Sequence, residues 1–465
     1  MFGGNLMKLV IVGGGPGGYV AALKASMFDV EVTVIENHKV GGTCLNFGCI
    51  PTKSLLASAN VLNTVLDAND FGINIDGDIS IDYNTIISRK DKIVDQLVKG
   101  VEFLLDKRKV SLVNGYGRII DRNTVEVTKA DGDIEIIKGD KIILAQGSKP
   151  VIPSIFPYDG KTIITSDDVL SLKELPKSMV VVGGGVIGCE IGQFFRSMGT
   201  EVTIVEMADQ LLINEDKDIV KQLVRQFKRD KIKIITGTSI VSCEVKDNNA
   251  TVELSDGKKI ETQYVLLSVG RKSNIEGSGI EDIGIQTKSG KVIVDKYLQT
   301  SVEGIYAVGD IIDTPFLAHV ASKEGEIAVD NALGRSRELN YTAIPRCVYT
   351  EPELASVGKT EKNLIKGEIP YRVGKFEFRG LGKAQTIGKY QGFVKVIVGE
   401  DDRILGASII GASATELLTE LTLAVHLGLT VQQVGDVIHP HPSLSEGLIE
   451  ALHDANGEAI HSVGK

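Results

Sequence analysis

Two stretches of the chain share one pattern of apolar and polar residues. Residues 8–12 and 30–36 are mostly apolar, and a glycine-rich turn and an amphipathic segment separate them. The same pattern recurs over residues 178–206. Apolar runs joined in this way are typical of the parallel strands of a β–α–β unit, because both faces of such strands are buried. The sequence therefore predicts two such units.

Each unit carries glycines at one spacing, followed by a glutamate at the end of its second strand. The residues are Gly13, Gly15, Gly18 and Glu36 in the first unit, and Gly183, Gly185, Gly188 and Glu206 in the second. In such a fingerprint the first glycine permits the turn, the second admits a pyrophosphate, and the third lets helix and strand pack. The helix N-terminus binds phosphates, and the carboxylate accepts hydrogen bonds from a ribose. We therefore expect two dinucleotide sites, and not glycines that serve only as turns.

The remaining pattern divides the chain further. Helical spacing predicts helices over residues 54–69 and 82–109, and short alternating strands follow over 110–145. A proline-rich crossing then leads into the second unit, which continues past a hairpin turn at Asp256-Gly257. Residues 299–310 return the chain to the first unit. From Ile344 the pattern is rich in strands, and from Ala414 it is helical.

Composition limits the function classes. A chain of 465 residues is long enough for two to four domains. Its net charge of -10, without any basic cluster, argues against a nucleic-acid partner, and no apolar run is long enough to span a membrane. The N-terminal residues lack a secretion signal, and five cysteines are too few for a secreted disulfide framework. We therefore expect a cytoplasmic protein.

Cys44 and Cys49 lie in the segment GGTCLNFGCIPTK, directly after the first unit. They could be two buried thiols or half of a metal site, but no second Cys/His pair lies nearby, so we expect no metal. Positions five apart on an ideal helix are too distant for a disulfide, so the pair needs a distorted turn, which Gly48 permits and Pro51 helps to set. We predict a redox-active pair. Its position places a resident flavin at the first unit and an exchangeable nicotinamide at the second.

Glu206 indicates which nicotinamide dinucleotide binds. A carboxylate at the adenosine ribose repels a 2′-phosphate, and no arginine follows between Met207 and Asn214. The second site is therefore expected to prefer NAD to NADP.

The segment from Gly41 to Lys53 resembles the redox-active segment of the flavin-dependent pyridine nucleotide–disulfide oxidoreductases. The similarity runs essentially from end to end, and within the family it is greatest to the members that oxidise dihydrolipoamide. The resemblance implies FAD at the first unit and NAD at the second. It also implies that Cys44 exchanges with substrate, that Cys49 faces the flavin as a thiolate, and that Lys53 pairs with Glu190 beside the reactive flavin nitrogen.

The resemblance assigns further residues to cofactor binding. Asp310 would bind the ribityl chain, and Ala318 and His319 would lie beside the flavin ring. The remaining residues assigned to cofactor binding are Gly147, Gly270 and Arg271, which lie where the two dinucleotide domains join. Two neighbours depart from the family pattern: Gln146 stands where threonine is usual, and Ser273 where proline is usual.

A C-terminal segment, HPHPSLSE, holds the last candidate site residues. A thiol–disulfide enzyme needs a base, and histidine is suited to that role near neutral pH. The resemblance implies that His441 is the base, that Glu446 orients it, and that the His441–Pro442 bond is cis. Ser443 and Glu446 also match a capping box, and both roles can coexist. His439 is expected to be structural.

The prediction for the whole chain is an α/β fold with two Rossmann-like domains and a C-terminal α+β dimerisation domain. FAD would bind residues 1–147 together with 271–343, NAD would bind 148–270, and 344–465 would form the interface of a homodimer. The implied reaction is oxidation of dihydrolipoyl groups by NAD⁺. The implied partner is a lipoyl-bearing protein of a 2-oxoacid dehydrogenase or glycine cleavage system. Two alternatives stay open: another NAD(P)H-dependent disulfide reductase of the family, and a docking component whose redox activity is incidental.

Overall fold

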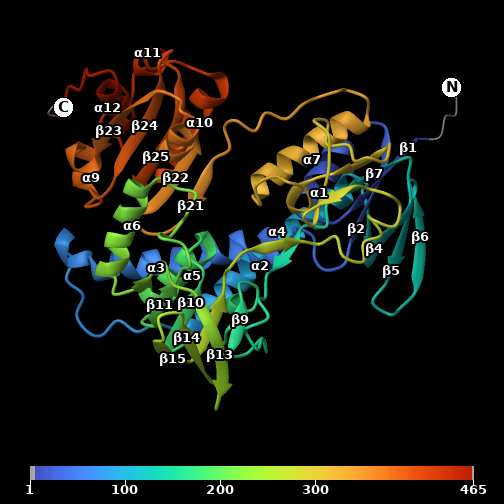
Figure 1. The fold of residues 1–465 in the computed structure, drawn as a ribbon, viewed down its shortest axis with the longest axis horizontal. Coiled ribbons are helices and arrows are strands. Elements are labelled where there is room, and N and C mark those ends of the chain that lie inside the picture. The colour runs from blue at the N-terminus through green and yellow to red at the C-terminus, as the bar shows by residue number, and fades with distance from the viewer. Residues whose placement is uncertain (1–5, 463–465) are drawn as a thin grey trace.

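A computed structural model describes residues 6–462, which form three five-stranded sheets together with smaller sheets and helices (Figure 1). Residues 1–5, part of the N-terminal stretch in which we expect no secretion signal, and residues 463–465 lie outside the described range. None of the helices within 6–462 has both the length and the apolar character needed to cross a membrane.

The first sheet is parallel and has the order β20-β7-β1-β2-β3. Its strands are β1 (Met7–Val12), β2 (Val30–Glu36), β3 (Ser111–Asn114), β7 (Lys141–Leu144) and β20 (Ile305–Ala307). Helix α1 (Pro16–Ala25) connects β1 to β2 and packs against α7 (Ala318–Ala332), which comes from much later in the chain (Figure 1). A three-stranded antiparallel sheet, β4 (Tyr116–Asp121), β5 (Thr124–Thr128) and β6 (Ile134–Lys138), is inserted before β7. The first predicted β–α–β unit is confirmed, and β20 shows the predicted return of the chain.

The second sheet is also parallel and has the order β12-β11-β10-β16-β9. Its parallel strands are β9 (Ile163–Thr165), β10 (Ser178–Val182), β11 (Glu201–Val205), β12 (Lys233–Ile235) and β16 (Tyr264–Leu267). Helix α5 (Val186–Ser197) connects β10 to β11, and α6 (Lys217–Arg229) precedes β12. An antiparallel sheet follows: β13 (Ile240–Lys246), β14 (Asn249–Leu254) and β15 (Lys259–Thr262). The predicted turn at Asp256-Gly257 joins β14 to β15, so the hairpin is confirmed.

The third sheet is antiparallel and has the order β21-β22-β25-β24-β23. Its strands are β21 (Arg346–Val348), β22 (Glu353–Gly358), β23 (Tyr371–Glu377), β24 (Phe393–Gly399) and β25 (Ile404–Gly411). Its helices are α8 (Glu361–Lys366), α9 (Gly382–Thr386), α10 (Ala414–Leu427), α11 (Val431–Gly435) and α12 (Glu446–Ala455). Helix α10 begins at Ala414, as the pattern predicts, and the fold class is confirmed. The limits of the domains stay a prediction.

Short elements join the sheets. Two pairs of short antiparallel strands lie within residues 6–462. Strand β8 (Ser148–Pro150) pairs with β17 (Arg271–Ser273), and strand β18 (Thr287–Lys288) pairs with β19 (Lys291–Val292). The short 3₁₀ turns within residues 6–462 are η1 (Ala68–Phe71), η2 (Val169–Ser171), η3 (Gly309–Ile311) and η4 (Phe378–Gly380). The pair β8–β17 connects the two parallel sheets and brings the end of the second unit beside η3.

The helices after the first unit differ in one respect from the prediction. Helix α4 (Tyr83–Lys107) agrees with it, and Asp82 caps the helix by accepting from Thr85 N–H at 3.0 Å. Helix α3 (Cys49–Leu66), however, begins at Cys49 and not near Ser54, so that limit was wrong. The physical reason is that Pro51 falls in the first helical turn, where the missing N–H costs no hydrogen bond. Cys49 therefore stands at the N-terminus of a long helix.

Candidate active site

A cavity of about 1930 Å³ runs along the carboxyl ends of both parallel sheets. Most of the residues predicted for the site line it: Gly13, Gly15, Glu36, Cys44, Cys49, Lys53, Gly147, Gly183, Gly185, Glu190, Glu206, Gly270, Arg271, Asp310, Ala318 and His319. The fold therefore brings together residues from three distant parts of the sequence. Four predicted residues are not among those lining it: Gly18, Gly188, His441 and Glu446.

The two glycine turns have nearly the same geometry. Gly13 has φ +108° and Gly183 has φ +103°. A Cβ on Gly13 would lie 2.2 Å from the carbonyl oxygen of Ala145, and a Cβ on Gly183 would lie 2.5 Å from that of Ser268. A Cβ on Gly18 would lie 1.7 Å from Gly13 O, so this glycine packs behind the turn, where its predicted role in helix–strand packing places it. Gly13, directly after β1, and Gly183, directly after β10, are therefore positions that require glycine.

The helices that follow these turns have open N-termini. Helix α1 begins after Gly15 and α5 after Gly185, and no side chain of residues 6–462 caps either end. Their first N–H groups therefore face the cavity without a partner from the described chain, and the helix dipole favours an anion there. This cradle fits a pyrophosphate at each turn, so the cavity has the form that two dinucleotides require.

The two strand-end glutamates are held in one orientation by the backbone. Glu36 accepts from Gly14 N–H at 2.7 Å and from His38 N–H at 2.8 Å. Glu206 accepts from Gly184 N–H at 2.6 Å and from Ala208 N–H at 2.7 Å. Each carboxylate oxygen keeps a further lone pair, and both residues line the cavity. The carboxylates are therefore preorganised as acceptors beside each turn.

Gly48 separates the two cysteines by breaking the helix between them. Cys44 lies in α2 (Gly42–Phe47), Cys49 opens α3, and Gly48 has φ −140° and ψ −107°. A Cβ on Gly48 would lie 3.1 Å from Thr43 O, a close contact. Both cysteines are free thiols, and their side chains hydrogen-bond each other. The structure thus shows the dithiol form of the predicted pair and the predicted distortion at Gly48.

The two thiols differ in acidity. The hydrogen bond from Cys44, aided by the Lys53 cation and opposed by burial, lowers the pKa of Cys49 to about 7. The same hydrogen bond, together with burial and the charge on Cys49, raises the pKa of Cys44. In the dithiol form Cys49 is therefore the thiolate, as the resemblance implies, and Cys44 is the hydrogen-bond donor.

The acidity of Cys49 gives a first testable prediction. Because its pKa in the folded dithiol is about 7, the thiolate is present above that pH and is lost as the pH falls through it. In reduced protein the thiolate absorbance should follow that titration. Cys44→Ser keeps a hydroxyl donor and should preserve a low midpoint, whereas Cys44→Ala removes the donor and should raise it. Equal midpoints in both variants would contradict the assigned hydrogen bond.

Lys53 and Glu190 form an ion pair beside the cysteines. Lys53 Nζ lies 3.0 Å and 2.8 Å from the two carboxylate oxygens of Glu190, which is 2% exposed. Tyr349 N–H donates to Glu190 Oε1 at 2.9 Å, and the Lys53 ammonium lies 4.4 Å from the centre of the Tyr349 ring. A buried carboxylate and an aromatic face therefore fix one cation at the wall of the cavity.

The described chain belongs to a known family. A family model described as pyridine nucleotide-disulphide oxidoreductase matches residues 7–325, and the dimerisation domain of the same family matches residues 344–452. The chain is a member of the pyridine nucleotide-disulphide oxidoreductases.

Relatives of this oxidoreductase cover nearly its whole length. It is 40% identical to the dihydrolipoyl dehydrogenase of Bacillus subtilis, over 97% of this chain and 98% of the relative. It is 39% identical to dihydrolipoyl dehydrogenase 1, mitochondrial, of Arabidopsis thaliana, over 99% of this chain and 92% of that relative. LpdA from Mycobacterium tuberculosis has a solved structure similar to this one, with a TM-score of 0.91, 28% identity and coverage of 96% and 99%. The solved Cu(II) complex of the HOCl-induced flavoprotein disulfide reductase RclA from Escherichia coli is also similar. Its TM-score is 0.87 at 27% sequence identity, and the match covers 97% of this chain and 99% of that one.

The two departures from the family pattern lie near each other in this oxidoreductase. Asn274 Nδ2 donates to Gln146 O at 3.0 Å, and Ser273 Oγ donates to Asp310 O at 2.5 Å. Ser273 thus supplies a hydroxyl donor that proline lacks. Asp310 also accepts from Ser148 Oγ at 2.5 Å, and burial raises the pKa of its carboxyl. Ser273 therefore braces the segment that the resemblance assigns to the ribityl chain, whereas the bond at Gln146 involves only its backbone oxygen.

Arg271 links the two dinucleotide regions. Its guanidinium donates to Ser148 O at 2.8 Å and to Asp167 Oδ1 at 3.2 Å, and it reaches Thr43 Oγ1, next to Cys44, at 3.4 Å. Its side chain is 12% exposed. The donors of Arg271 are therefore largely occupied within the protein, and the side chain braces the redox helix against the second unit.

His441 and Glu446 form a pair at the surface of the C-terminal region. His441 Nδ1 lies 2.7 Å from Glu446 Oε1, and Ser443 N–H donates to Glu446 Oε2 at 2.8 Å. These contacts hold the pKa of Glu446 below its ordinary value. The His441–Pro442 bond is cis, and the His441 side chain is 78% exposed. The imidazole is thus oriented by a carboxylate but lies outside the cavity of its own chain.

Sequence reasoning missed two residues near the site. Glu324 is fully buried on α7 and accepts from Gly309 N–H at 2.6 Å and from Tyr341 Oη at 3.0 Å. It lies four positions after Val320 and three before Ile327, so helical periodicity could have placed it on the buried face. Cys347 is only partly buried and lines the cavity. Burial raises its pKa to about 11, so it remains a thiol.

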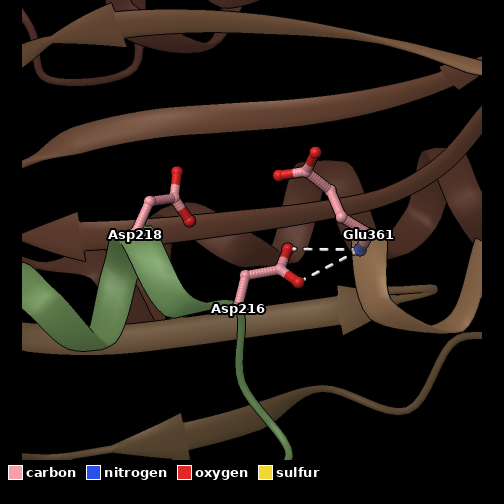
Figure 2. A group of neighbouring side chains, drawn as sticks. All are labelled: Asp216, Asp218 and Glu361. Carbon is pink, nitrogen blue, oxygen red and sulfur yellow. Dashed lines mark hydrogen bonds between the residues drawn. The ribbon is translucent and has the colours of Figure 1, made fainter. Parts of the chain in front are cut away.

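A cluster of acidic residues elsewhere resembles a metal site but binds a lysine. Asp216, Asp218 and Glu361 converge between α6 and α8 (Figure 2). Lys395 Nζ lies 2.9, 2.8 and 2.7 Å from their carboxylates, and its side chain is 1% exposed. Burial alone would lower the pKa of Lys395, but these three partners raise it. The lysine ammonium is therefore the cation that this cluster holds.

Proposed function

We propose that this chain oxidises dihydrolipoyl groups with NAD⁺: dihydrolipoamide + NAD⁺ → lipoamide + NADH + H⁺. One observation carries the proposal. A dithiol with a low-pKa thiolate lies in one cavity with two phosphate turns. The relatives named dihydrolipoyl dehydrogenase, which cover nearly the whole chain, support the choice of substrate.

The cysteine pair would carry out the exchange. Starting from the oxidised pair, one thiol of the substrate attacks Cys44 Sγ, the Cys44–Cys49 bond breaks, and Cys49 leaves as the thiolate that its low pKa favours. The second substrate thiol then displaces Cys44 and closes the substrate disulfide. The substrate loses two electrons and two protons, and the pair gains the electrons.

The residues of the cavity fit the two cofactors that this reaction needs. Gly13, Gly15, Glu36 and Asp310 would hold FAD beside the cysteines, while Gly183, Gly185 and Glu206 would hold NAD. When bound, FAD supplies a two-electron carrier between the dithiol and NAD⁺. Lys53, held by Glu190, would supply a cation where negative charge increases on reduction.

The base would come from a second copy. The dimerisation domain supports a homodimer. His441 is exposed and lies outside the cavity of its own chain, and Glu446 orients its ring. We propose that His441 of one copy takes the substrate proton at the cysteines of the other.

The partner and the location follow from the same proposal. The substrate group would be presented by a lipoyl-bearing protein of a 2-oxoacid dehydrogenase or glycine cleavage system. We retain a cytoplasmic location and the domain limits 1–147, 148–270, 271–343 and 344–465 as parts of the proposal.

A comparison of substrates tests the proposal. Initial rates should be measured with dihydrolipoamide, glutathione and coenzyme A, and with their disulfides in the reverse direction, each with NAD(H) and NADP(H). The proposal predicts that dihydrolipoamide with NAD⁺ gives the highest kcat/KM. A higher value for a glutathione or coenzyme A disulfide would favour the alternative reductase. Purified protein without bound FAD would contradict the proposal altogether.

Dinucleotide preference gives a second prediction. Glu206→Gln with Met207→Arg, at a residue that is 76% exposed, removes the carboxylate and adds a cation for a 2′-phosphate. A charged hydrogen bond is worth about 1.5–3 kcal/mol, so kcat/KM for NAD⁺ should fall roughly tenfold or more while that for NADP⁺ rises. Glu36→Gln, with the same backbone contacts at the first turn, is the control and should leave the NAD⁺/NADP⁺ ratio unchanged. A wild-type preference for NADP⁺ would refute the argument from Glu206.

A further inference from the structure

A short connection in the third sheet is hydrogen-bonded to helix α5. The connection comprises residues 349–352, between β21 and β22. Tyr349 N–H donates to Glu190 Oε1 at 2.9 Å, and Glu351 N–H donates to Gln193 Oε1 at 2.7 Å. Gln193 Nε2 in turn donates to Glu351 O at 2.7 Å. Two side chains of one helix therefore bind the backbone of a segment that lies far along the chain.

Gln193 is buried in this contact. It is 5% exposed, and Glu190, three positions earlier on the same face of α5, is 2% exposed. The Gln193 amide satisfies both backbone groups of Glu351, as a neighbouring strand would. Its Nε2 also lies 3.3 Å from Asp230 Oδ2. Gln193 thus fixes the connection against the turn of α5 that carries Glu190.

The connection reaches the redox centre through Tyr349. Lys53 Nζ lies 2.8 Å from Glu190 Oε2 and 4.4 Å from the centre of the Tyr349 ring. Lys53 therefore contacts a carboxylate of α5 and an aromatic ring of the connection, and Gln193 ties these two elements together. Lys53 also lies four positions after Cys49 on α3, so both are on one face of that helix.

The charges that act on Cys49 show what a shift of the connection would change. Lys53 lowers the pKa of Cys49 and Glu190 raises it, in addition to the hydrogen bond from Cys44. A Lys53 side chain that is no longer held in place would lower that pKa less. It would also offset less of the negative charge that a flavin gains on reduction.

We propose that Gln193 is a positioning residue of the redox site, because it holds the connection against α5 and thereby fixes the Lys53–Glu190 pair. The dimerisation domain thus takes part in setting the place of the Lys53 cation beside the cysteines of its own chain. This inference rests on the proposed roles of Lys53 and FAD in the reaction.

Two properties of the redox site test this inference. In Gln193→Met the side chain keeps its length but loses the amide, so the connection is released from α5. In reduced protein the midpoint of the Cys49 thiolate absorbance should rise by about half a pH unit or more, because an opposite charge within about 4–6 Å typically shifts a pKa by about 1–3 units. In the holoenzyme the reduction potential of FAD should become more negative, because a nearby cation favours the negatively charged reduced ring.

Gln226→Met on α6 is the matched control. Gln226 Nε2 donates to Asp230 Oδ1 at 2.9 Å, so this amide shares a partner with Gln193. Gln226 is not among the residues that line the cavity, and its variant should alter thermal unfolding without moving either property. If Gln193→Met does not fold, Gln193→Glu, which keeps the acceptor for Glu351 N–H, takes its place. Measured against Gln226→Glu, which adds the same charge, it should show a smaller shift in the same direction.

Each outcome decides between the inference and its alternatives. Folded Gln193 variants with the wild-type midpoint and potential would overturn the inference while leaving the proposed function intact. Equal shifts in the Gln226 variants would also overturn it, because they would show that loosening this group of side chains is enough. A wild-type protein that carries no FAD would instead defeat the proposed function.

Discussion

Cys44→Ser will abolish the oxidation of dihydrolipoamide but leave the oxidation of NADH by artificial acceptors nearly unchanged. The exchange with substrate needs a sulfur at position 44, and serine cannot form a disulfide. Transfer between NADH and FAD bypasses the pair, so an acceptor that takes electrons from the flavin still works. The two activities should be measured on one preparation, so that a loss of fold would appear as a loss of both.

The spectrum of the same variant separates the roles of the two cysteines. Cys44→Ser leaves Cys49 as a low-pKa thiolate held near Lys53, and a charge-transfer band with oxidised flavin should appear at long wavelength. Cys49→Ser, the matched control, also loses turnover but should lack that band. If both variants show the same spectrum, the assignment of the thiolate to Cys49 is wrong.

His441→Gln will slow lipoamide turnover by about 10²–10⁴-fold, the usual contribution of a general base. Flavin reduction by NADH should hardly change, because His441 lies outside the cavity of its own chain. Glu446→Gln should lose less, since Glu446 accepts from the ring at 2.7 Å and orients it without moving the proton to substrate. Steady-state and rapid-reaction rates on the same variants distinguish these effects.

The chain offers a matched control for that histidine. His461 is 71% exposed and its Nδ1 lies 2.7 Å from a Glu450 oxygen, so it repeats the exposure and the carboxylate contact of His441. His461→Gln should turn over near the wild-type rate. A loss as large as that of His441→Gln would show that any exposed histidine–glutamate pair here gives the effect.

Mixed dimers test whether the site is shared. If His441 serves the other copy, a dimer of one Cys44→Ser chain and one His441→Gln chain holds one site with both defects and one intact site. Such isolated dimers should recover up to half of the wild-type activity. Activity no higher than that of either parent would place His441 at the cysteines of its own chain.

The two β–α–β units could be predicted because each lies within a short span of sequence. Gly13 and Gly183 follow continuous apolar strands, and local sterics at a positive φ demand glycine there. The start of α3 could not be predicted from pattern alone, because Pro51 is a helix breaker in the interior but is tolerated in the first turn. Its position depends on the break at Gly48, which only the three-dimensional structure shows.

Contacts between distant segments were beyond the reach of the pattern. The Lys53–Glu190 pair joins residues 137 positions apart and was expected only through the resemblance. The bond from Ser273 Oγ to Asp310 O depends on the pairing of β17 with β8 next to η3, and no local signal encodes it. Gln146 stood out in the sequence as a departure, but only burial showed that its amide lacks a partner within the described chain.

The most direct test of the account is to follow the redox state of the cysteine pair during one turnover. Oxidised enzyme should be mixed with one equivalent of dihydrolipoamide without oxygen, quenched with acid, alkylated, and analysed by peptide mass spectrometry, with and without NAD⁺. The account predicts that dihydrolipoamide converts the Cys44–Cys49 disulfide to two alkylated thiols. It further predicts that NAD⁺ restores the disulfide and forms one NADH per chain. Cysteines whose state is unaffected by dihydrolipoamide, or reduced cysteines that NAD⁺ cannot reoxidise, would contradict it.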